Sequence, residues 1–360
     1  MKKRASLYPE VHEWSNLLRA WRQARKGKRG RPSVASFERN AAENLLDLQR
    51  RLRRRRYWPA AYDSFYVHDP KRRLISAAPF RDRVVHHALC NVMEPVFERR
   101  FIHDSYANRR GKGTHAALDR AQALARRYRY VLPFDVEQFF PAVDHRILLR
   151  ILERVIADPD LLWLCRTILA SGDGVLWEEY SMRYFPGDDL LAVNRPRGLP
   201  IGNLTSQFWA NVYLDPLDHF VKRQLRCRGY LRFVDDGLLF ADRKETLWEW
   251  RSAIIGFLEG LRLTLHEASC QPRPVTEGIP FLGFVVFPHH RRLKRRKGIA
   301  YRRRLKHLLA AYGRGEVDRE AVRASVRGWV NHARFGQTRG LRRRLFEEVP
   351  PILFDRKEPR

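Results

Sequence analysis

The chain of 360 residues lacks the segments that mark membrane or secreted proteins. It has no long apolar run, and residues 1–14 carry charge without an apolar stretch after them, so neither a spanning helix nor a signal peptide is expected. Its four cysteines are far apart and form no CxxC pair, which argues against a disulfide framework and against a zinc site. We therefore expect a cytoplasmic protein with reduced thiols and no membrane partner.

Acidic residues are scarce relative to basic ones: 40 Asp and Glu stand against 70 Lys and Arg, giving a net charge of +30. Such an excess at this length indicates a polyanionic partner, most simply a nucleic acid. The basic run at residues 50–56 (RRLRRRR) is expected to contact phosphates, with an ordinary basic helix surface as the alternative. A hydrophobic content of 44% fits a globular chain, and the length suggests two or three subdomains.

Two apolar stretches carry carboxylates. Residues 231–240 read LRFVDDGLLF, where apolar residues at even steps indicate strands and Asp236-Gly237 is a tight-turn dipeptide. The stretch predicts a hairpin with Asp235 and Asp236 at or beside its tip, although by itself it could be an ordinary surface turn. Residues 130–140 (YVLPFDVEQFF) add a second apolar run that ends in Asp135. Carboxylates at two strand ends can meet and hold divalent metal ions, which is the arrangement used in two-metal phosphoryl transfer.

The remaining pattern predicts mixed helices and short strands. In the first third of the chain we expect helices within 7–56 around a loop at RKGKRGRPS, a hairpin over 62–77 with its turn at 68–70, a helix after Pro79, and a Gly-rich basic loop (DSYANRRGKG) that leads into a helix. In the middle we expect a strand at 128–135, one or two helices over 144–170, an irregular segment or a hairpin over 171–198, and a long helix after GLPIGN. After the Asp-Asp-Gly hairpin we expect a helix over 246–261, an apolar strand pair in GIPFLGFVVFP, and basic helices after residue 290. The Gly-rich loop lacks the GxxxxGK[ST] pattern, so it is not a P-loop.

Four motifs in order, FDVEQFF, GLPIGNLTSQ, FVDDG and FLGF, resemble the palm of a reverse transcriptase, and the resemblance covers roughly residues 62–345. It implies an α+β right-hand polymerase fold, with an antiparallel palm sheet flanked by helices, fingers and a helical thumb. The implied organisation is a basic helical N-terminal extension at 1–61, fingers at 62–130, a palm at 131–290 with a finger insertion around 146–198, a basic helical thumb at 291–345, and a tail at 346–360.

One helix motif narrows the resemblance. It usually reads QGxxxSP, whereas this chain has IGNLTSQ, with Ile201 and Gln207 at the ends. This departure is similar to the enzymes of diversity-generating retroelements, a group related to group II intron reverse transcriptases. The implied function is error-prone synthesis of cDNA on a structured RNA. The alternatives are an antiphage-defence or free-standing intron-like reverse transcriptase, and a non-catalytic RNA-binding protein on the same fold.

The resemblance also implies site residues, carried over position by position. Asp135 and Asp235 are the expected catalytic metal ligands, with Asp236 beside them and the Val136 carbonyl as a further ligand. Phe140 matches the bulky residue that excludes a 2′-hydroxyl. The other implied nucleotide-binding residues are Arg109, Lys112, Gly202 and Gln207. The implied template and fidelity residues are Ile201, Asn203 and Ser206, and the implied primer grip consists of Phe281, Leu282 and Gly283.

The implied cofactor is a pair of Mg²⁺ ions, with Mn²⁺ able to substitute. The implied partners are an RNA template, an RNA–DNA duplex, dNTP substrates and a small basic helical accessory protein. The family usually has a lysine after LHxx, but this chain reads LHEASCQPRP, with Ser269 at the matching position. Such a lysine is a candidate acid for the leaving pyrophosphate, so its replacement puts fast turnover in doubt.

Overall fold

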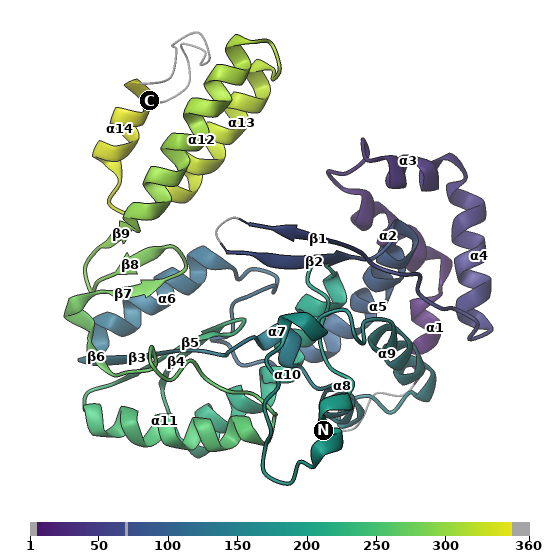
Figure 1. The fold of residues 1–360 in the computed structure, drawn as a ribbon, viewed down its shortest axis with the longest axis horizontal. Coiled ribbons are helices and arrows are strands. Elements are labelled where there is room, and N and C mark those ends of the chain that lie inside the picture. The colour runs from purple at the N-terminus through teal and green to yellow at the C-terminus, as the bar shows by residue number, and fades with distance from the viewer. Residues whose placement is uncertain (1–5, 69–70, 348–360) are drawn as a thin grey trace.

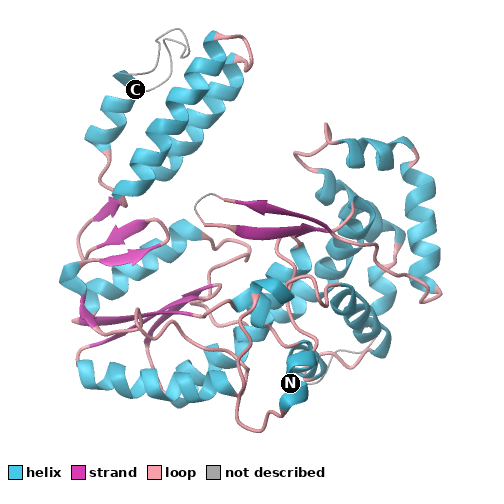
Figure 2. Ribbon diagram, in the orientation of Figure 1, coloured by secondary structure: helices cyan, strands magenta, loops and turns pink. Residues whose placement is uncertain are grey.

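The computed structural model describes residues 6–68 and 71–347. Helices and three small antiparallel sheets make up the fold, which confirms the expected α+β class (Figure 1). Figure 2 shows most of the strands in the left half of the molecule, with helices above and below them. No helix within the described residues is both long and apolar enough to span a bilayer. All four cysteines are buried thiols.

The N-terminal part is helical, as its leucine spacing predicts. Three of its helices, α1 (Tyr8–Val11), α2 (Trp14–Arg25) and α3 (Pro32–Arg39), pack against α5 (Phe80–Glu98), the long helix that follows the first hairpin. The fourth, α4 (Ala41–Arg53), packs against α2 and α3. Leu17, Leu45, Leu48 and Leu52 are completely or almost completely buried, because residues three and four apart share one helix face. The expected loop lies at residues 26–31, and Pro32 begins α3, where its missing N–H costs nothing.

The first hairpin is formed by β1 (Asp63–Val67) and β2 (Arg73–Ala77), with Asp63 opposite Ala77. The hairpin itself is as predicted, while part of its expected turn, residues 69 and 70, lies outside the described residues. All five β1 residues are exposed, and the hairpin extends from the helical N-terminal part toward the other sheets (Figure 1).

The central sheet has the strand order β4-β5-β3-β6, all antiparallel. Its strands are β3 (Tyr130–Asp135), β4 (Gly229–Phe233), β5 (Asp236–Ala241) and β6 (Arg273–Pro274). Leu132 and Phe134 face a core shared with α10 (Leu204–His219) and α11 (Lys244–Glu259). Val131 and Leu238 face a second core shared with α6 (Thr114–Arg127). Both faces are covered, so these strands read as continuous apolar runs.

The β4–β5 turn differs from the sequence-based prediction. Phe233 pairs with Asp236, so the two turn residues are Val234 and Asp235, while the Asp236-Gly237 dipeptide lies within β5. Val234 adopts φ +57°, a conformation that is rare for a β-branched residue. Gly237 is required for packing rather than for turning, because a Cβ there would overlap the Phe134 ring.

The third sheet supports the C-terminal helices. Its strands are β7 (Ile279–Phe281), β8 (Phe284–Val286) and β9 (Arg291–Leu293), and they lead into α12 (Arg295–Gly313), α13 (Arg319–Ala333) and α14 (Arg339–Glu347). The predicted strand pair and the predicted basic helices are thus present. Figure 1 shows the three helices projecting away from the sheets. Of the expected tail, residues 348–360 lie outside the described residues.

The segment between β3 and α10 begins with α7 (Phe139–Ala142), which was not predicted. The one or two helices predicted over 144–170 are confirmed as α8 (His145–Glu153) and α9 (Pro159–Ser171). The irregular segment predicted over 171–198 is confirmed, and its alternative, a hairpin, is wrong. That segment forms two short 3-10 turns, Trp177–Glu179 and Leu190–Asn194. Ion pairs from Asp188 to Arg195 and to Arg262 hold it in place of a strand ladder.

Candidate active site

Three carboxylates meet where β3 and β5 end. Asp135 is the last residue of β3 and lies directly opposite Asp236, the first residue of β5. Asp235 occupies the turn immediately before Asp236. Residues directly opposite on neighbouring antiparallel strands have their Cβ atoms about 4.5–5.5 Å apart. The sheet therefore brings together the carboxylates that the two separate sequence stretches predicted.

The pKa values of these carboxyl groups rise because they are desolvated and close to one another. Desolvation, followed by repulsion from Asp135, raises the pKa of Asp235. The pKa of Asp236 rises to about 7 through desolvation and through the charges of Asp135 and Asp235. Asp236 nevertheless keeps an exposed surface, so water screens part of this effect. Desolvation also raises the pKa of Asp135, against the opposing charges of His266, Lys71 and Arg73.

The donor chemistry at this point fits a hard divalent cation. Carboxylate oxygens are the ligands that Mg²⁺ prefers, and mutual repulsion among them is relieved by a bound cation. Across residues 6–68 and 71–347, no three His, Cys, Asp or Glu side chains already surround one point. The expected set of Asp135, Asp235, Asp236 and the Val136 carbonyl stays a prediction, supported by the strand register and by the raised pKa values.

The sequence analysis did not identify His266 and Glu137 as neighbours of Asp135. His266 lies with Nε2 3.9 Å from Asp135 Oδ2 and Nδ1 3.1 Å from Glu137 Oε1. The segment is held there by backbone bonds, because His266 N–H donates to the Asp135 carbonyl and Glu137 N–H donates to the Thr264 carbonyl. Ser269, at the expected lysine position, is exposed, and its hydroxyl donates to the His266 carbonyl at 3.0 Å.

The IGNLTSQ loop is fixed to the first hairpin. Ser76 N–H donates to the Ile201 carbonyl at 2.8 Å, and Ala78 N–H donates to Asn203 Oδ1 at 3.0 Å. Asn203 Nδ2 donates back to the Ser76 carbonyl at 2.8 Å. Gly202 adopts φ +116°, and a Cβ there would press on Ile75. Asn203 is buried by these contacts, so the structure gives it an anchoring position.

The other predicted residues of this region differ in exposure. Ser206 is buried, Ile201 is half-buried, and Gln207 and Gly202 are exposed. Phe140 is half-buried against Phe139, and its carbonyl accepts from Leu199 N–H at 2.8 Å. The proposed roles of these residues toward a nucleotide or template stay predictions.

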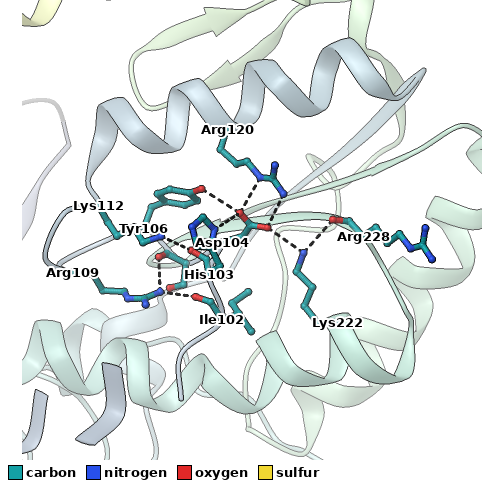
Figure 3. A network of polar contacts seen from close by, with 10 residues as sticks. Ile102, His103, Asp104, Tyr106, Arg109, Lys112, Arg120, Lys222 and Arg228 are labelled. Atoms are coloured by element: carbon teal, nitrogen blue, oxygen red, sulfur yellow. Dashed lines mark hydrogen bonds and ion pairs between the residues drawn. The ribbon is translucent and has the colours of Figure 1, made fainter. Parts of the chain in front are cut away.

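The Gly-rich loop carries the predicted nucleotide ligands Arg109 and Lys112. Arg109 turns inward, where it pairs with Glu98 at 2.6 Å and donates to the carbonyls of Ile102 and Ser105. Lys112 is half-buried, and its Nζ donates to the His103 carbonyl at 2.9 Å. Their contact with a triphosphate stays a prediction, and in this conformation both side chains brace the loop (Figure 3).

A buried carboxylate anchors the same loop. Asp104 accepts from Arg120 Nε at 2.9 Å and Nη2 at 3.1 Å, from the Tyr106 hydroxyl at 3.2 Å and from Lys222 at 3.3 Å (Figure 3). Although desolvation opposes the charged form, Arg120 and Lys222 hold the pKa of Asp104 below its usual range. The loop is therefore fixed to α6 and to the segment after α10.

The predicted primer grip forms the β7–β8 turn. Phe281 pairs with Phe284, so Leu282 and Gly283 are the two turn residues, at φ +46° and +88°. Lys294 N–H donates to the Gly283 carbonyl at 3.0 Å. The charge of the Lys294 ammonium partly offsets the rise in the pKa of Asp236.

The chain matches the family described as reverse transcriptase (RNA-dependent DNA polymerase) over residues 68–286. This match covers more than half of the chain and includes all three carboxylates. The chain therefore belongs to the reverse transcriptase family, as its motifs suggested.

Curated relatives match at modest identity. Nuclear intron maturase 1, mitochondrial, of Arabidopsis thaliana is 28% identical over 163 residues, which are 39% of this chain and 23% of that protein. Protein YkfC of Escherichia coli is 25% identical over 264 residues, 63% of this chain and 64% of that protein. Group II intron-encoded protein LtrA of Lactococcus lactis subsp. cremoris is 25% identical over 168 residues, 46% of this chain and 26% of that protein. The chain thus spans between 23% and 64% of these relatives.

Solved structures with a similar arrangement include apo telomerase from Candida tropicalis. It has 10% sequence identity and a TM-score of 0.47, with 66% of this chain and 49% of that chain covered.

Proposed function

We propose that the chain is an RNA-directed DNA polymerase that extends a primer on an RNA template. The observation that carries the proposal is the register of Asp135 opposite Asp236, with Asp235 in the adjoining turn. In this proposal the β1–β2 hairpin belongs to the fingers, the β4-β5-β3-β6 sheet is the palm, and α12 to α14 form the thumb. Family membership and the net charge of +30 support it.

Asp135, Asp235, Asp236 and the Val136 carbonyl would hold two Mg²⁺ ions. When bound, such ions activate the primer 3′-hydroxyl as nucleophile and stabilise the leaving pyrophosphate. The chain's own residues place the reactants. The Phe140 ring limits space beside the nucleotide sugar, and the cations Lys71, Arg73 and Lys294, whose charges act on the carboxylates, add positive charge for the phosphates. The exposed basic helices bind the duplex through its backbone, so base pairing supplies the sequence choice.

Primer extension on an RNA template with Mg²⁺ and dNTPs tests this function. The wild-type chain should synthesise cDNA, whereas Asp135→Asn should give none and should keep its RNA affinity within about two-fold, because many basic residues hold the RNA. A wild-type chain without synthesis, or an equally active variant, would overturn the proposal.

We also propose error-prone synthesis, as in a diversity-generating retroelement, with a small basic helical accessory protein as partner. This finer proposal rests on Ile201 and Gln207, since an apolar Ile201 gives up one hydrogen-bonding side chain beside the nascent base pair. Such a bond is worth about 1 kcal/mol, or several-fold in misincorporation. Sequencing of cDNA should show fewer errors for Ile201→Gln. Equal error spectra would mean that Ile201 only packs against the hairpin.

A group II intron-like enzyme is a second candidate, favoured by the names of the intron maturase and LtrA relatives. The neighbouring genes discriminate between the two. A template repeat with a variable repeat and a small accessory gene supports the retroelement, and flanking intron RNA supports the intron enzyme.

A further inference from the structure

A fully buried arginine lies directly beneath the turn that carries Asp235. Arg232 has no exposed surface, and neither has its partner Asp218 on α10. Its Nε and Nη2 donate to the two Asp218 oxygens at 2.8 and 2.6 Å. Tyr230 also donates to Asp218 at 2.8 Å. A buried pair of this kind is retained only when its geometry is nearly complete, because both charges have lost their water.

The third guanidinium nitrogen points at the turn. Arg232 Nη1 donates to the carbonyl of Val234 at 2.7 Å and to Asn211 Oδ1 at 3.3 Å. Val234 is the residue held at φ +57°, which is costly for valine. The bond from Arg232 therefore acts on the strained peptide group immediately before Asp235.

The same residue also holds the Gly-rich loop. Arg232 N–H donates to the Asp104 carbonyl, and Tyr106 N–H donates to the Arg232 carbonyl, both at 2.9 Å. Asn211 Nδ2 extends this connection by donating to the Ala107 carbonyl at 2.8 Å. Beyond these contacts, the loop continues to Arg109 and Lys112.

We propose that Arg232 is a positioning residue that holds the Asp235 turn and the Arg109–Lys112 loop in one fixed relation. The inference rests on the proposed polymerase function, because that function assigns metal binding to the Asp235 turn and nucleotide binding to the Arg109–Lys112 loop. Only a planar guanidinium can serve Asp218, Asn211 and Val234 together, since a lysine ammonium is a compact charge without this fork. Arg232→Lys therefore keeps the charge for Asp218 and removes the hold on the turn.

The first measurement is single-nucleotide incorporation on a primed RNA template, normalised to the fraction of protein that binds the template. Arg232→Lys should lower kcat by about ten-fold or more, since a displacement of about 1 Å at a reacting centre can cost 10²-fold. RNA affinity should stay within about two-fold. The matched control is Arg195→Lys, which changes a buried arginine paired with Asp144 and Asp188 and should alter kcat less than three-fold. Equal losses in kcat for the two variants would overturn the proposal.

A rescue separates positioning from general stability. Glycine adopts positive φ without strain, so Val234→Gly should make the turn less dependent on Arg232. In the Arg232→Lys background, Val234→Gly should recover kcat by at least three-fold. If Arg232→Lys does not fold, Asn211→Ser is used in its place. This variant removes the side-chain link from Arg232 to the Ala107 carbonyl and keeps the bond to Val234, so kcat should fall and Val234→Gly should not restore it. Absence of rescue in the Arg232→Lys background, or an unchanged kcat in Asn211→Ser, overturns the proposal.

Hydrogen exchange provides a readout that needs no catalysis. Arg232→Lys should speed exchange at residues 104–107 and 234–236 together and leave residues 145–152 in α8 unchanged. Unchanged exchange in the first two segments, or faster exchange in only one, contradicts the proposed coupling. If the wild-type chain makes no cDNA, the polymerase proposal fails, while exchange still tests the link between turn and loop.

Discussion

The two-residue turns of β4–β5 and β7–β8 have similar roles in their sheets but are stabilised differently. In the β7–β8 turn both residues have positive φ, and Gly283 takes the larger angle at little cost. In the β4–β5 turn a valine takes φ +57° and is followed by the carboxylate of Asp235. The conformation of the β7–β8 turn is thus favoured by its own glycine, whereas the β4–β5 turn is stabilised by a hydrogen bond from the buried Arg232. A turn that contains glycine adopts positive φ at little cost, whereas a turn with valine at positive φ is stabilised by a contact from outside the turn.

The two turns should differ most in nucleotide incorporation when one residue of each is replaced by asparagine. Asp235→Asn should reduce nucleotide incorporation by at least about 10²–10³-fold, because it removes a charge that would hold the catalytic cation. Leu282→Asn should reduce it less than ten-fold, because asparagine tolerates positive φ. Incorporation rates at saturating dNTP and primed template measure both. Comparable losses would remove the distinction between the two turns.

A side chain at Gly283 should destabilise the protein. Alanine at φ +88° costs about 1–2 kcal/mol of backbone strain, and a new Cβ would have only His332 Nε2 near it, at 3.9 Å. The melting temperature of Gly283→Ala should therefore fall. The matched control is Gly256→Ala within α11, where nothing lies within 4 Å and alanine should stabilise the helix by about 0.5–1 kcal/mol. A fall in both variants would show that strain is not the cause.

Val234→Gly should leave the unfolding free energy within about 0.5 kcal/mol of wild type. Relief of about 1–2 kcal/mol of left-handed strain is offset by the extra chain entropy of glycine and by lost half-buried contacts. Denaturant unfolding would measure this difference. A loss well above 1 kcal/mol would mean that Val234 is chosen for packing and that its conformation is not strained.

The smallest expected effect is on the pH dependence of stability. The folded pKa of Asp236, about 7, exceeds an unfolded value near 4, so its contribution to stability is present below about pH 4 and lost as pH rises toward 7. Relative to Asp236→Asn, the wild-type melting temperature should therefore fall across this range. Added Mg²⁺ should offset the fall at pH 7–8. A pH-independent difference would show that the carboxylates do not repel one another.

The sequence predicted the elements better than it predicted their connections. Apolar alternation correctly indicated strands on both sides of the Asp-Asp-Gly, but the Asp-Gly preference put the turn two residues late. Two tertiary contacts outweigh the local preference for a turn at Asp-Gly. The Phe134 ring packs against Gly237 and excludes a side chain there, and Arg232 donates a hydrogen bond to the Val234 carbonyl in the observed turn. Arg232 lies within the apolar strand β4, and a buried arginine requires a carboxylate partner. This position could therefore have indicated the ion pair with Asp218 from the sequence.

The sequence correctly placed Asp135 at the end of one strand and Asp235 beside the end of another, because this placement depends on residue type and order. Side-chain direction was not predictable. Arg109 reads as an exposed loop cation, yet its side chain is only 5% exposed because Glu98 and two carbonyls take its donors. His266 and Glu137 are distant in sequence, and only the backbone bonds at the end of β3 bring them together.

The bonds between the β1–β2 hairpin and the IGNLTSQ loop have a mechanical consequence. Because Ser76 and Ala78 are tied to Ile201 and Asn203 in both directions, the hairpin cannot tilt without carrying the start of α10 with it. A substitution that shifts the hairpin is therefore transmitted to the loop as a rigid displacement. In the proposed polymerase, a shift of the hairpin against the template strand would therefore also change the geometry at the templating base.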